Sequence, residues 1–134
     1  MRTALFRLGT LLLINHFWMI GATAEVRIQV EGLLVVTECR GANYQQISTN
    51  SVSRSIIEIA ASCVRMGAPV AVLTDGENGD RLYTLVSPSK SLARYIARYA
   101  RLTGKEIAPR IVVPQKLEIR TPNGWIEVPT SSMM

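Results

Sequence analysis

The sequence predicts a small α+β domain that is mainly β and contains two helices. Residues 26–31 alternate between apolar and polar side chains, as a strand with one buried face does. Further short apolar segments follow, and Gly, Pro, Asn and Asp separate them in the way that turns separate strands. Apolar residues repeat at helical spacing in two segments, 53–66 and 87–103. These three features lead to the predicted fold class.

In the N-terminal half we expect a strand, a long loop and a helix. The alternation continues into the apolar run 33–36, and Gly32 before it predicts a bulge or a bend. The polar residues 41–53 predict a long loop. A helix should then run from Ser53, its expected N-cap, to Met66. Its apolar face contains Ile56, Ile59, Ala60 and Cys63.

In the C-terminal half we expect a hairpin, a second helix and three more strands. The segment 75–80 is rich in turn residues and separates two strand-like segments, 70–74 and 81–86. Ser87 is the expected cap of the second helix, which Gly104 ends. The remaining strands are predicted at 107–113, with an interruption at Pro109, and at 116–120 and 125–128. The sequence Pro122-Asn123-Gly124 predicts a type I′ hairpin turn before the last strand.

This order of elements fits a small, partly open barrel best, so we predict an OB-like fold. An open α+β sandwich is the alternative. No repeat, low-complexity run or linker divides the chain, and residues 25–129 are expected to form one domain. Residues 130–134 are expected to form a disordered tail.

The N-terminus predicts export, because residues 1–24 have the three parts of a cleavable signal peptide. Arg2 and Arg7 form the basic part, residues 8–21 form the apolar part, and Ala22-Thr23-Ala24 is a small-x-small site before Glu25. A retained membrane anchor is the alternative, but this apolar run is shorter than the roughly 20 residues that a spanning helix needs. The protein is therefore expected to be periplasmic or secreted, with no membrane span after cleavage.

Cleavage would change the chemistry that the chain can perform. His16, the only histidine, would leave with the signal, which excludes Ser-His and Cys-His catalysis. Loss of Arg2 and Arg7 lowers the net charge from +5 to +3, a field too weak to predict nucleic-acid binding. We therefore expect no catalytic residue, no metal site and no cofactor.

The remaining chain has two cysteines, Cys39 and Cys63. An isolated pair in an oxidising compartment usually forms a disulfide, and the spacing is not that of a C-x-x-C redox motif. Free thiols and a redox or metal-handling site are the alternatives. A disulfide closing this loop would stabilise the fold by about 3.5 kcal/mol.

Several segments together resemble a known group of proteins. Cys39 follows the first strand, the first helix ends in Cys63-Val-Arg-Met-Gly67-Ala-Pro69, the following hairpin carries Tyr83, and Thr103-Gly104-Lys105-Glu106 leads into a later strand. Over about residues 30–120 the chain resembles small exported bacterial proteins with a single OB-like domain and paired cysteines. Members of that group often carry another cysteine where this chain has Ala60-Ala61-Ser62. The resemblance implies the fold and the compartment, and no reaction.

The second predicted helix carries the candidate binding residues, because its basic side chains would share one helical face. These residues are Lys90, Arg94, Arg98 and Arg101, and Lys105 extends the basic region. Such a face could bind a protein partner or an anionic envelope surface. The alternative is an ordinary solvated face of an amphipathic helix.

Two other motifs are better explained by structure than by chemistry. Ser87-Pro88-Ser89-Lys90 matches the S-x-x-K motif of penicillin-recognising enzymes, but the partner motifs are missing and a helix cap explains it. The acidic segment 75–80 lacks the register of a calcium loop. The leading hypothesis is therefore an exported, non-enzymatic binding or accessory module, and a thiol-redox or metal-handling protein is the alternative.

The protein recovered from its native envelope should begin at Glu25 and be two hydrogen atoms lighter than its reduced form, because of signal cleavage and disulfide formation. Intact mass spectrometry with and without reduction and alkylation measures both. A full-length mass would instead indicate a retained anchor, and two readily alkylated thiols would favour the redox alternative.

Overall fold

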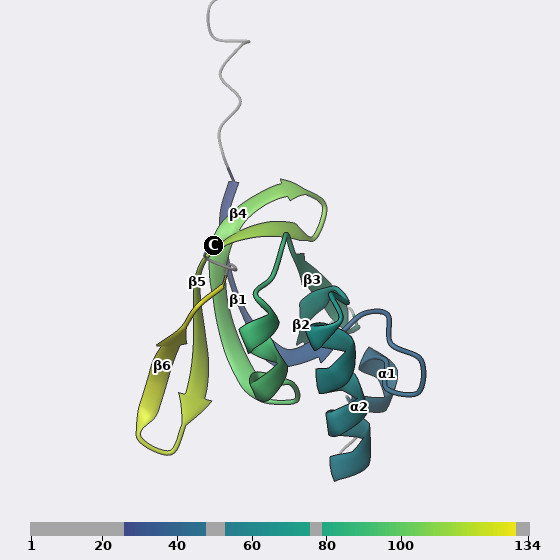
Figure 1. Ribbon diagram of the computed structural model, residues 1–134. Coiled ribbons are helices and arrows are strands. Elements are labelled where there is room, and N and C mark those ends of the chain that lie inside the picture. Colours follow the sequence, from purple (N-terminus) through teal and green to yellow (C-terminus); the bar gives the residue numbers. More distant parts are fainter. Residues whose placement is uncertain (1–25, 48–52, 76–78, 131–134) are drawn as a thin grey trace, which may run out of the picture.

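The computed structural model describes residues 26–47, 53–75 and 79–130, whose six strands pair in the order β3-β2-β1-β4-β5-β6 (Figure 1). A parallel pairing of β3 with β5 closes the first five strands into a barrel, and all other pairings are antiparallel. β4 returns to lie beside β1, which gives the strands β4-β1-β2-β3 a Greek-key order. The strands are β1 (Val26–Val36), β2 (Val70–Thr74), β3 (Arg81–Leu85), β4 (Tyr99–Ala108), β5 (Ile111–Thr121) and β6 (Gly124–Val128). The predicted mainly β α+β barrel is confirmed at this level.

The inside of the barrel is filled by every second residue of its strands. On one side of β1, Leu34 lies opposite Val72 of β2. Further round, Leu102 of β4 lies opposite Leu117 of β5. All four side chains are fully buried. The alternation that predicted the first strand therefore also determines which side chains fill the core.

Gly32 allows β1 to pair with β4 along one part of its length and with β2 along the next. A Cβ atom at this position would overlap the carbonyl oxygen of Leu73 on β2. Gly32 is therefore a point of close backbone approach within one continuous strand, and the bend predicted there comes from contact between strands. Gly104 of β4 is a second point of close approach, because a Cβ atom there would overlap the carbonyl oxygen of Val113 on β5.

Two helices pack against the outside of β1, beside its pairing with β2. Val35 and Ala71 face away from the barrel interior and are still fully buried, because α1 (Tyr44–Ile47) and α2 (Arg54–Arg65) pack on this side. α2 is the first predicted helix, and its cap is confirmed, since the Ser53 hydroxyl accepts a hydrogen bond from the Ile56 N–H. α1 lies where the polar sequence predicted only a loop.

The second predicted helix is mostly wrong. It is reduced to a short 3-10 helix, η2 (Lys90–Tyr95), and the residues from Tyr99 onward belong to β4. The helix ends because the segment after it forms hydrogen bonds with β1. The Ala97 N–H donates to the Leu34 carbonyl, and the Leu34 N–H donates to the Arg98 carbonyl. The cap is Ser89 and not Ser87, since the Ser89 hydroxyl accepts from the Ser91 N–H.

Two predicted details near the C-terminus are also wrong. The segment 107–113 is not one strand, because Pro109 and Arg110 form the turn between β4 and β5. The β5–β6 turn is not type I′, because the proline ring of Pro122 cannot adopt the positive φ that such a turn requires. Gly124 alone in that turn has a positive φ, of 118°. The predicted signal 1–24 and the end of the predicted tail, 131–134, lie outside the described residues.

Gly32→Ala should lower the free energy of unfolding by about 1–3 kcal/mol, because the new methyl group forces β1 and β2 apart in a packed core. Urea unfolding followed by circular dichroism measures this. Gln29→Ala, at an exposed position of the same strand, is the matched control. Equal midpoints for Gly32→Ala and the unmodified protein would contradict the close approach.

Candidate binding site

The basic residues proposed from the sequence do not form one helical face. Lys90 and Arg94 lie on η2, Arg98 lies in the connection to β4, and Arg101 and Lys105 lie on β4 itself. Because the helix ends at residue 95, the spacing on which that face was predicted does not apply. Lys90 and Arg94 belong to one region of the surface and Arg101 to another, and the role of the five residues in binding stays a prediction.

Arg101 is the centre of the first region. Strand register places it between Glu31 of β1 and Glu118 of β5, on the outer face of the barrel. Its Nε atom donates to Glu118 Oε1 at 3.0 Å, and its Nη1 atom lies 3.8 Å from Glu31 Oε1. Lys116 Nζ lies 3.9 Å from the other oxygen of Glu118. Arg101 is therefore held in place from both neighbouring strands.

This arrangement shifts the pKa values of both partners. The hydrogen bond from Arg101 lowers the pKa of Glu118, and its positive charge and that of Lys116 act in the same direction against partial burial. The same hydrogen bond raises the pKa of Arg101. Glu118 is therefore ionised at neutral pH, and its side chain is only 13 % exposed.

Two aromatic rings complete the first region, which we call the aromatic–arginine surface (Tyr99, Arg101, Arg120 and Trp125). The Arg101 guanidinium carbon lies 4.4 Å from the centre of the Trp125 ring, and that of Arg120 lies 5.9 Å from the Tyr99 ring. The two rings are 6.2 Å apart and tilted by 41°. These distances suit cation–π and tilted aromatic contacts.

This surface was not predicted, because Tyr99 lies in the segment 87–103, whose apolar spacing predicted a helix. Tyr99 is in fact 39 % exposed, and Trp125 is half-buried. Strand alternation in the sequence could have revealed it, since Tyr99 and Arg101 alternate with the buried residues Ala100 and Leu102. Pairing with β5 then places Arg101 opposite Glu118, and Tyr99 contacts Trp125 of β6. No spacing along the chain relates these residues.

The surface continues to a strand edge. Within the described sheet, β6 pairs with β5 alone, so its other edge leaves backbone groups unpaired. Ile126 lies opposite the buried Ile119 but is itself 44 % exposed, on the face of β6 away from Trp125. β6 therefore exposes a large apolar side chain on each of its faces. Figure 1 shows the β5–β6 hairpin on the far side of the barrel from α1 and α2.

A separate hollow of about 400 Å³ lies between α1, β3 and the β4–β5 turn. Tyr44, Arg81 and Arg110 are among the residues that line it. Arg110 has a φ of 60°, at a turn position where glycine is usual, and its N–H donates to Glu106 Oε2 at 3.4 Å.

The acidic segment 75–80, judged unsuitable for calcium, brings two carboxyl groups together at its ends. A hydrogen bond with Asp75 is the main cause of a raised pKa for Asp80, and burial and the charge of Asp75 raise it further. Residues 76–78 lie outside the described part of the chain. Within the described residues no group of three or more His, Cys, Asp or Glu is placed to hold a metal ion.

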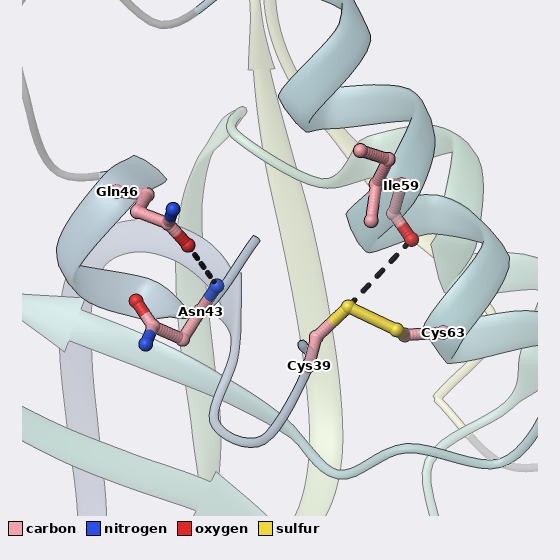
Figure 2. The surroundings of a disulfide bond; sticks show 5 residues. All are labelled: Cys39, Asn43, Gln46, Ile59 and Cys63. Atoms are coloured by element: carbon pink, nitrogen blue, oxygen red, sulfur yellow. Dashed lines mark hydrogen bonds between the residues drawn. A yellow bond between two sulfur atoms is a disulfide. The ribbon is translucent and has the colours of Figure 1, made fainter. Parts of the chain in front are cut away.

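The predicted disulfide is confirmed. Cys39, just after β1, is bonded to Cys63 near the end of α2, with 6.0 Å between their Cα atoms (Figure 2). Cys39 is only 8 % exposed, and no described cysteine is free. Its Sγ atom lies 3.7 Å from the Ile59 carbonyl oxygen (dashed in Figure 2), a packing contact, since an oxidised sulfur has no proton to donate. The disulfide ties α2 to the end of β1.

Comparison with known proteins does not assign this chain to a group. No model of a protein family, no curated protein and no solved structure matches it significantly. The resemblance to small exported OB-like proteins therefore stays a prediction. Among the described residues, no helix is both long enough and apolar enough to cross a membrane.

Glu118→Gln should reduce the loss of stability on acidification. Because the pKa of Glu118 is lowered in the folded protein, ionised Glu118 stabilises the fold above its ordinary pKa of 4.5. This stabilisation is lost as the pH falls through the lower folded-state pKa. Urea midpoints at about pH 6 and about pH 3 measure the difference. The control is Glu127→Gln, which removes the carboxylate opposite Glu118 on β6. An equal acid dependence in both variants and the unmodified protein would rule out this contribution.

Proposed function

We propose that this chain is an exported, non-enzymatic binding module that docks onto a protein partner through β6 and the aromatic–arginine surface, and that its barrel is OB-like. The five-strand closure and the Greek-key order, with short helices outside the sheet, support the OB-like assignment. The predicted signal and the disulfide support export, because disulfides persist in oxidising compartments. A periplasmic or secreted location follows from this proposal.

The observation that carries the proposal is the partly exposed Trp125, with Arg101 over its ring, on the edge strand of the described sheet. Trp, Tyr and Arg are the residues that most often contribute the binding energy of protein interfaces. Here ion pairs and ring contacts already hold the aromatic and arginine side chains in place. These side chains therefore lose little conformational freedom when a partner binds. This is the kind of preorganised surface that favours specific docking.

The chemistry of β6 favours an extended segment of the partner, added as a further strand. The unpaired backbone groups of the edge can form ladder hydrogen bonds with such a segment. Its side chains would alternate between the face of Trp125 and the face of Ile126, both of which offer apolar contact. The charged residues around Arg101 would form the polar rim.

The thiol-redox alternative has less support. A redox role needs a thiol that solvent and substrate can reach, whereas Cys39 is nearly buried in the core and both cysteines are bonded. The disulfide instead joins two elements of the fold. We therefore assign it a structural role within the proposal.

A photo-crosslinking amino acid placed at Ile126 should give a discrete adduct with one envelope protein in intact cells. The adduct should disappear when Trp125→Ala is added, because the docking surface loses its main aromatic anchor. Immunoblotting detects the adduct, and mass spectrometry identifies the partner.

The matched control places the same crosslinker at Ile59 of α2, which is 43 % exposed against 44 % for Ile126. It should give no such adduct. The same bands from both positions, or no adduct at Ile126 in envelopes that contain the folded protein, would refute docking through β6.

A further inference from the structure

We propose that a recess between α2 and η2 is a binding site for a phosphoryl group, separate from the docking surface on β6. The recess has a volume of about 360 Å³ and is lined by Arg65, Lys90, Ser91, Ala93 and Arg94. It shares no residue with the aromatic–arginine surface. It includes two of the basic residues proposed from the sequence, Lys90 and Arg94, and adds Arg65, which no spacing along the chain relates to them.

The basic residues of the recess lie on two helical segments, and buried residues of each segment anchor it in the core. Arg65 is the last residue of α2, next to the buried Val64 and two residues after Cys63 of the disulfide. Lys90 and Arg94 belong to η2, which Leu92 and Ala93 anchor in the core. α2 and η2 pack directly against each other, as Figure 1 shows (η2 is the green coil beside α2). Their relative position is therefore fixed before a ligand arrives.

The charges in the recess are not compensated within the described residues. Arg65, Lys90 and Arg94 form no ion pair there, and no acidic residue lines the recess. Arg101 is the contrast, since two carboxylates flank it. Like charges that line one recess repel one another, and an anion bound there reduces this repulsion. The recess therefore has the electrostatic properties of an anion site.

The donor set favours a phosphoryl group over a single carboxylate. Two guanidinium groups can each bind two oxygens, and the ammonium of Lys90 can bind a third, which matches the several oxygens of a phosphate. The Ser91 hydroxyl, now 2.7 Å from the Ser89 hydroxyl, can add a further hydrogen bond. An anionic lipid headgroup and a soluble phosphate compound share this chemistry, and the experiment separates them.

Two probes test the site on the purified protein. Isothermal titration with inorganic pyrophosphate measures binding of a soluble phosphoryl compound. Co-sedimentation with phosphatidylglycerol vesicles, against phosphatidylcholine vesicles, measures binding of a lipid headgroup. The double variant Arg65→Gln/Arg94→Gln should weaken binding of whichever probe binds by at least about tenfold, because it removes two charge-assisted contacts.

The matched control is Arg27→Gln/Arg40→Gln, which removes two exposed arginines elsewhere and lowers the net charge equally. It should change binding by no more than about twofold. Pyrophosphate binding lost only in the first variant supports the site with a soluble ligand, and vesicle binding alone lost in this way supports it with a lipid headgroup. Binding of neither probe, or equal weakening in both variants, would overturn the proposal. Equal urea midpoints for the two variants show that the fold is retained.

Discussion

At Gly32 the backbone of β2 comes so close to β1 that a side chain of any size would overlap it, and the barrel depends on this approach. β1 pairs with β4 up to Leu33 and with β2 from Leu33 onward. The strand can bend from one neighbour to the other without a gap only because nothing lies between the two backbones. Opposite Gly32 on β4 stands the small, fully buried Ala100. Small residues on both strands thus allow a tightly curved sheet.

The same register determines the outer surface. Since neighbouring side chains on a strand point to opposite faces, the pairing that buries Ala100 also places Tyr99 and Arg101 outside. β5 then brings Glu118 to Arg101, and the β5–β6 hairpin brings Trp125 onto the same face. The proposed docking surface is therefore a consequence of strand register, and its residues come from three strands, β4, β5 and β6.

The disulfide organises the opposite side of the molecule. It fixes the C-terminal end of α2 to the segment after β1, and α2 in turn packs against η2. This places Arg65 beside the two basic residues of η2. A small domain buries a limited apolar area, so a covalent bond that holds a helix in place also holds the side chains at the end of that helix. The disulfide at Cys63 therefore helps to position Arg65 in the proposed phosphoryl site.

The sequence by itself determined the features that depend on local patterns. The alternation in β1, the helix after the Ser53 cap and the pairing of Cys39 with Cys63 follow from side-chain periodicity, a capping residue and a cysteine pair. Only the tertiary structure decided that residues from Tyr99 onward form a strand, because over a few residues helical and strand periodicity both fit the same apolar positions. Hydrogen bonds of Ala97 and Arg98 with Leu34 of β1 resolved that ambiguity, and pairing between strands then formed the surface that no spacing along the chain could predict.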